Sequence, residues 1–142
     1  MKLLRMFGII AAIFLAISCT KDILSVNDIP TITGKWNVIT DSTFSGVGAG
    51  NHPVNLSGQR GDYFDFRSDG IVYIKEGATL DKLSYTLTSD TTIVMKSFGG
   101  ITLNGVPETS FITNLTIHTV TITAPFLYTP GGTFGRKVNL TK

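Results

Sequence analysis

Residues 32–39 read ITGKWNVI and contain Trp36, the only Trp of this 142-residue chain. Over residues 34–44 the side chains alternate, with Trp36, Val38 and Thr40 on one face. Alternation with a period of two predicts a half-buried β-strand. The stretch before this strand is typical of an export signal and a tether, and the stretch after it is typical of a small β domain. We therefore take this strand as the first element of the folded domain.

The rest of the chain continues the alternation, and no segment after residue 34 shows the 3.6-residue period of a helix. Tight turns separate the segments; residues 68–70, Ser-Asp-Gly, place Gly where a hairpin requires a positive φ. Eight strands with mostly short connections predict an all-β, antiparallel up-and-down barrel, because closure removes exposed edges. An open two-sheet sandwich is the alternative. The expected strands are residues 34–44, 61–67, 71–76, 81–88, 91–103, 108–116, 119–124 and 134–140.

Two longer connections interrupt this pattern. Residues 45–60 are rich in Gly and contain a Pro, so we expect no regular structure there. Residues 125–132 form a second loop with an apolar tip, Phe126, Leu127 and Tyr128. Long loops in small domains are often functional. The two loops are therefore candidates for contact with a partner.

The first nineteen residues have the parts of an export signal. Lys2 and Arg5 form a basic start, residues 6–17 carry no charge, and a small residue precedes Cys19. The apolar run is too short to span a bilayer as a stable helix, for which about 20 residues are needed. Residues 15–19, Leu-Ala-Ile-Ser-Cys, resemble a bacterial lipobox. The resemblance implies that Cys19 becomes the acylated first residue of the mature protein; an ordinary secretory signal with an incidental Cys is the alternative.

Acylation would anchor the protein to a membrane, because each buried methylene contributes roughly 0.8 kcal/mol. Thr20 follows Cys19, and without Asp at that position the lipobox resemblance implies the outer membrane of a Gram-negative bacterium, on either face. We expect residues 1–18 to be the signal peptide, 19–31 the lipidated tether and 32–142 the barrel domain.

The strand order and two motifs resemble the lipocalins. Gly-Lys-Trp opens the first strand, and a long loop follows it. GKWNV at residues 34–38, together with DYFDFRSDG at residues 62–70, more closely resembles the short lipocalin-like lipoproteins of Bacteroidetes, over residues 31–142. The chain lacks the Thr-Asp-Tyr motif of many lipocalins.

The lipocalin resemblance implies a structural role for Gly34 and Trp36. In lipocalins this Trp plugs the closed end of the barrel, beneath a basic residue from the last strand. Arg136 is the candidate for that residue, because it is in phase with inward positions of the last expected strand, and Lys137 replaces it if the register slips by one. An Arg over a Trp ring contributes roughly 0.5–2 kcal/mol.

Charge and reactive residues exclude several function classes. Without residues 1–18, ten basic and ten acidic side chains remain, which leaves no electrostatic case for binding nucleic acid. The two histidines have no partner at metal-ligand spacing, and Asp62, Asp65 and Asp69 are expected along a solvated strand edge. No Ser has a nucleophile-elbow context, and no Gly-rich loop precedes a helix. We therefore predict a monomeric, non-enzymatic protein without metal or cofactor.

Two functions remain open. The first is the binding of a small apolar ligand inside the barrel, although an eight-stranded interior can be filled by side chains. The candidate lining residues are Phe64, Phe66, Tyr85, Met95 and Phe111. The second is a solid barrel that contacts an envelope protein or glycan, as a binding or inhibitor module, through its apolar loop tip. An interior void above roughly 300 Å³ favours the first function, and a filled interior favours the second.

Overall fold

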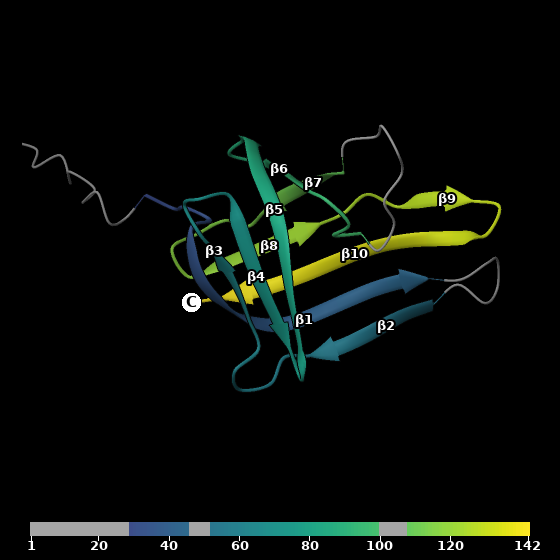
Figure 1. Ribbon diagram of the computed structural model, residues 1–142, viewed down its shortest axis with the longest axis horizontal. Coiled ribbons are helices and arrows are strands. Elements are labelled where there is room, and N and C mark those ends of the chain that lie inside the picture. The colour runs from purple at the N-terminus through teal and green to yellow at the C-terminus, as the bar shows by residue number, and fades with distance from the viewer. Residues whose placement is uncertain (1–28, 46–51, 100–107) are drawn as a thin grey trace, which may run out of the picture.

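The computed structural model describes residues 29–45, 52–99 and 108–142, so Cys19, the export signal and most of the tether lie outside the described part (Figure 1). Within these ranges the chain is all β, and no helix is long and apolar enough to cross a membrane. The strands are β1 Gly34–Ser45, β2 His52–Ser57, β3 Tyr63–Phe66, β4 Ile71–Glu76, β5 Thr79–Ser89, β6 Thr92–Met95, β7 Thr109–Thr113, β8 Thr119–Thr123, β9 Leu127–Thr129 and β10 Gly132–Thr141.

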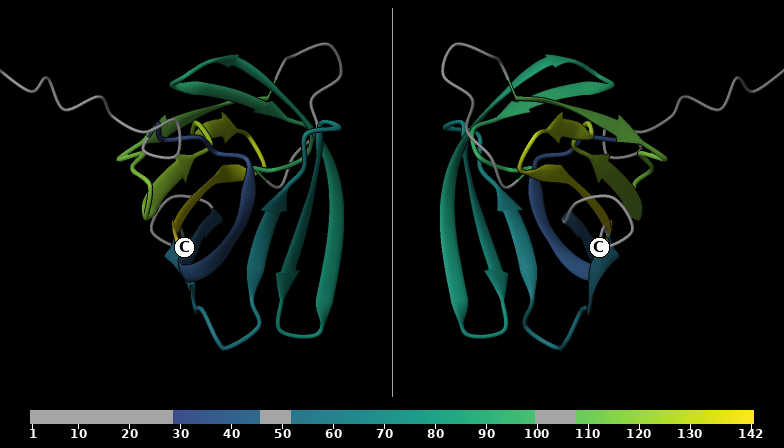
Figure 2. Two further views of the ribbon diagram at one scale, coloured as in Figure 1. Left: turned by 90° about the vertical axis from the view of Figure 1, so that its left-hand side faces the viewer. Right: turned by 90° about the vertical axis from the view of Figure 1, so that its right-hand side faces the viewer.

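Eight of these strands close into an antiparallel up-and-down barrel of lipocalin-like form. The order around the ring is β1, β3, β4, β5, β6, β7, β8 and β10, and pairing of β10 with β1 completes it. In Figure 2 the teal strands β3 to β5 form one wall, and the blue β1 and yellow β10 lie opposite. The predicted barrel is confirmed, and the alternative of an open sandwich is wrong.

The two remaining strands extend the barrel on one side. β2 pairs with the second half of β1, from Thr40 to Ser45, and β9 pairs with the first residues of β10. Figure 1 shows these four segments projecting together beyond the rest of the barrel. We expected irregular structure over residues 45–60 and 125–132, and this was wrong for β2 and β9. The reason is that β1 and β10 run past the barrel, and their free edges pair with the returning chain.

Apolar side chains fill the interior of the barrel. Strict alternation in β3 and β4 points one face of each strand inward, as the sequence predicts. Burial of these side chains supplies the main driving force for folding. The fully buried set is Trp36, Phe64, Phe66, Val72, Ile74, Ile93, Met95, Phe98, Val120, Ile122, Val138 and Leu140.

An irregularity in β1 changes which of its side chains face inward. Ile39 is the extra residue between the pairs Val38–Leu140 and Thr40–Asn139. An extra residue in one strand is a β-bulge, and it shifts the alternation that follows. Asp41 therefore faces the interior at 4% exposure, where the sequence placed Thr40.

The phase predicted for β7 was also wrong. Phe111 is 50% exposed on the outer face, while Ser110 and Ile112 are buried. Two bulky apolar residues stand side by side here, so period-two alternation permits either of them to face inward. Of the expected strand over residues 91–103, β6 covers Thr92–Met95, and residues 100–103 lie outside the described part.

The strand directions give the barrel two distinct ends. At the first, called the Trp36 end, lie the segment 29–33, the β3–β4, β5–β6 and β7–β8 turns, and the C-terminal residue. At the second, called the far end, lie the β1–β3, β4–β5, β6–β7 and β8–β10 connections. The two long loops predicted from sequence therefore share the far end.

Candidate functional site

Trp36 closes one end of the barrel together with the chain that precedes it. The indole Nε1 donates a hydrogen bond to the carbonyl oxygen of Ile32, at 2.6 Å, and both side chains are buried. Gly34 lies between them with φ +115°, a conformation that L side chains rarely adopt. The positive φ lets the segment 29–33 turn across the barrel end before β1 begins.

The basic residue over Trp36 is Lys142, and the prediction of Arg136 was wrong. Lys142 Nζ lies 4.3 Å from the centroid of the Trp36 ring. The backbone N–H of Lys142 donates to the carbonyl oxygen of His118, at 3.0 Å, which holds the C-terminus at this end. Asn37 pairs with Thr141, so antiparallel register places Trp36 beside the last residue of the chain. Alternation correctly predicted that Arg136 faces inward, but it did not predict how far along the barrel axis Arg136 lies.

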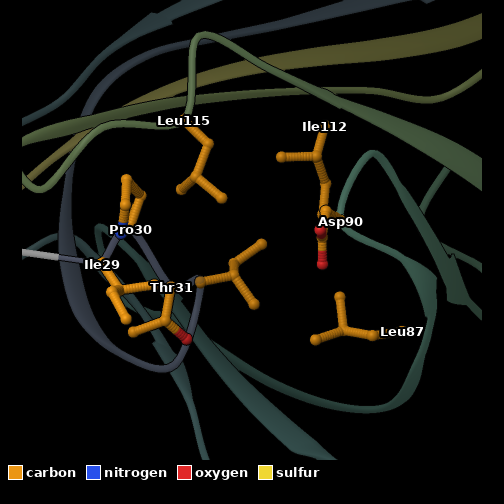
Figure 3. Close-up of a pocket in the computed structure, with 8 residues that line it drawn as sticks. Ile29, Pro30, Thr31, Leu87, Asp90, Ile112 and Leu115 are labelled. Carbon is orange, nitrogen blue, oxygen red and sulfur yellow. The ribbon is translucent and has the colours of Figure 1, made fainter. Parts of the chain in front are cut away.

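A pocket of about 390 Å³ opens at the Trp36 end, between the segment before β1 and the strands β5 and β7 (Figure 3). Leu87 of β5 and Ile112 of β7 form one side, and the chain at 29–32 forms the opposite side. Its volume lies within the usual range for ligand pockets, roughly 300–1,000 Å³. The lining residues are Ile29, Pro30, Thr31, Ile32, Leu87, Asp90, Ile112 and Leu115.

The pocket exposes apolar surface that the fold does not cover. Its floor is buried, because Ile32 and Ile112 pack into the core cluster and Leu115 packs against that cluster. Its rim is open, with Ile29 63% and Leu87 44% exposed. Large apolar side chains left open around a concavity are typical of ligand sites.

The pocket is formed by residues that the sequence analysis did not select. Segment 29–31 was assigned to the tether. Leu87 was not selected as a candidate lining residue. No sequence signal shows that a tether residue and a residue nearly sixty positions later share a cavity, because only barrel closure brings them together.

Four of the five predicted lining residues lie inside the barrel, but they fill it. The ring centroids of Phe66 and Tyr85 are 5.4 Å apart, edge to face, and those of Phe64 and Phe66 are 6.2 Å apart. Tyr85 donates its hydroxyl to the carbonyl oxygen of Arg67, at 2.7 Å, and burial raises the pKa of Tyr85. Met95 is fully buried. None of the four lines the pocket, so they act as its structural support.

Arg136 lies in a buried charge cluster toward the far end. Its Nε donates to Asp41 at 2.7 Å, and one terminal nitrogen donates to Glu76 at 2.9 Å. The guanidinium also stacks on Phe98, 4.7 Å from the ring centroid. Burial first, and then the bond with Asp41, raise the pKa of Glu76 to about 7. No sequence pattern indicates this cluster, because Asp41 faces inward only through the bulge in β1.

Three aspartates expected along a solvated strand edge have different environments. Asp62 is buried, and its two oxygens accept backbone N–H groups of Gln59 and Gly77, each at 2.8 Å. These bonds lower the pKa of Asp62, and they tie the β1–β3 connection to the β4–β5 turn. Asp65 pairs with the exposed Arg67. Asp69 accepts the backbone N–H of Ile71, the first residue of β4, at 3.1 Å and so caps the β3–β4 turn.

The predicted apolar tip lies at the far end and is partly packed. Phe126 contacts Phe44 edge to face, with centroids 5.1 Å apart, and its ring lies so close to Gly135 that a Cβ there would clash. Leu127 is half-buried in β9. Tyr128 remains 81% exposed. The tip is therefore mainly a cover for the strand extension, with one free aromatic ring.

Among residues 29–45, 52–99 and 108–142, no group of three or more His, Cys, Asp or Glu side chains could hold a metal ion. No protein-family model, no curated protein and no solved structure matches this chain.

Proposed function

We propose that this protein is a non-enzymatic binding protein of the cell envelope, tethered by an acylated Cys19, whose barrel binds a small apolar ligand in the pocket at the Trp36 end. The observation that carries the proposal is the pocket of about 390 Å³ with an open apolar rim. The interior of the barrel is not the site, because aromatic and aliphatic side chains fill it.

The position of the pocket agrees with a tethered protein. Its wall at Ile29 and Pro30 belongs to residues 19–31, the expected tether. Ile29 lies ten positions after Cys19, so fully extended chain spans at most about 35 Å between them. A ligand drawn from the membrane would therefore enter at the end of the barrel that lies nearest to it along the chain.

Single-site variants on one strand test the pocket. The full chain carrying Cys19→Ala is titrated with the neutral apolar probe N-phenyl-1-naphthylamine, with probe fluorescence and Trp36 fluorescence as readouts. Trp36 reports on the site because its indole is bonded to Ile32, a lining residue. Leu87→Arg should weaken binding at least tenfold. Leu80→Arg is the matched control, because Leu80 is an exposed Leu at the other end of the same strand.

Equal binding by the two variants, or absence of probe binding to the parent protein, contradicts the proposed site. The tether has a separate test. Mass spectrometry of membrane-extracted protein should show an acyl mass on the parent chain that Cys19→Ala lacks.

The alternative function, contact with an envelope protein or glycan, is favoured by two observations, the filled interior of the barrel and the exposed ring of Tyr128. Tyr128→Ser should leave the free energy of unfolding within about 0.5 kcal/mol, since exposed substitutions rarely do more. Loss of envelope partners from cross-linked cells with this variant, together with intact probe binding, would support the alternative.

A further inference from the structure

We infer that the pocket selects amphiphiles with a cationic head and rejects carboxylates, through Asp90. The inference rests on the proposed function, since it names the ligand class of the same pocket. Asp90 is the only charged residue among the eight that line the cavity. Figure 3 shows it on the side of Ile112 and Leu87, across the pocket from Ile29 and Pro30.

The carboxylate of Asp90 has no partner among the described residues. The ion pairs among the described residues join Arg67 with Asp65, and Arg136 with Asp41 and Glu76. Lys142, a basic side chain at this end, lies over the ring of Trp36. Aspartate side chains are negative at neutral pH, so the pocket carries one uncompensated negative charge.

The β5–β6 turn does not use this carboxylate to hold its shape. The backbone N–H of Thr91 donates to Ser89 Oγ at 3.2 Å, and Ser89 Oγ also contacts Thr92 Oγ1 at 2.7 Å. Asp90 stands between these residues without joining the hydrogen bonds. Its side chain is therefore free to meet a group on a ligand.

The surroundings of Asp90 explain the expected selectivity. The apolar walls contact the alkyl or ring part of a ligand, so they do not distinguish a cationic head group from an anionic one. A positive head near the carboxylate gains Coulomb attraction, and a carboxylate head is repelled by a similar amount. Because Asp90 is exposed, both effects are moderate and depend on salt.

The test compares three ligands with the same chain and different heads. Dodecylammonium, dodecanol and dodecanoate, below their aggregation limits, displace N-phenyl-1-naphthylamine from the full chain carrying Cys19→Ala. We expect dodecylammonium to bind about fivefold more tightly than dodecanol, and dodecanoate about fivefold more weakly. Asp90→Asn should bring all three affinities together and leave dodecanol unchanged.

Asp81→Asn is the matched control, because it removes the same charge from the start of β5, the strand that leads to Asp90, and lies outside the pocket. It should preserve the order of the three ligands. Raising the salt concentration should narrow the differences in the parent protein, a readout that needs no variant.

The outcomes separate the two proposals. If neither probe nor dodecanol binds, the proposed function fails. If dodecanol binds but the three affinities are equal, or Asp90→Asn leaves their order intact, the pocket stands and the inference about Asp90 is overturned.

Discussion

The two ends of the barrel differ in whether their charged side chains are paired. At the Trp36 end one carboxylate, Asp90, borders an open apolar pocket and has no partner among the described residues. Toward the far end Arg136 holds two carboxylates, Asp41 and Glu76, inside the barrel. Charges that are buried require partners, whereas a charge at an open rim is solvated. The paired cluster therefore acts in stability, and the unpaired group is available to a ligand.

Removing the centre of the cluster should have the largest effect on stability. Arg136→Ala leaves Asp41 buried without its cation, and breaking a buried pair on one side costs about 3–5 kcal/mol. The measurement is the free energy of unfolding from urea titration. Arg67→Ala is the control, because its pair with Asp65 is exposed and should cost about 0–1 kcal/mol. Similar losses in the two variants would contradict the contrast between the ends.

The cluster should also make stability depend on pH. The folded-state pKa of Glu76, about 7, lies above its ordinary value of 4.5. The contribution of this group to stability is therefore complete below pH 4.5 and is lost as the pH rises through 7. Allowing for solvent screening at a half-buried site, we expect the free energy of unfolding to be about 1–2 kcal/mol higher at pH 5 than at pH 8.

Glu76→Gln should remove most of this difference between pH 5 and pH 8. Asp62 does not interfere in this window, because its pKa is lowered from 3.8. A parent protein with equal stability at both pH values would show that Glu76 is solvated.

The smallest effect on the free energy of unfolding is expected at the Trp36 end. Lys142→Met removes the ammonium over the ring of Trp36 and should cost about 0.5–1 kcal/mol, as for exposed cation–π contacts. The fluorescence of the protein should also change in Lys142→Met, because the ammonium lies over the ring of Trp36 and Trp36 is the only Trp of the chain. Lys137→Met is the control, since Lys137 is an exposed residue of β10. An unchanged spectrum in Lys142→Met would argue against the contact.

Local alternation was sufficient to predict the barrel but not the position of each side chain along it. The inward faces of β3 and β4 came from strict alternation, and the core confirms them. Where two bulky residues are adjacent, as at Phe111, the phase is ambiguous and the prediction failed. The level of Arg136 was missed because register between the first and last strands is set by closure of the ring.

The sequence by itself determined the all-β class, the closed eight-stranded order and the role of Trp36 as an inward residue of the first strand. These features follow from local periodicity and turn chemistry, which neighbouring residues encode. The tertiary structure alone decided that Lys142 covers Trp36, that Asp41 and Glu76 share Arg136, and that Ile29 and Leu87 border one pocket. Each of these contacts joins residues far apart in the chain, and only the bulge, the register and the closing of the barrel bring them together.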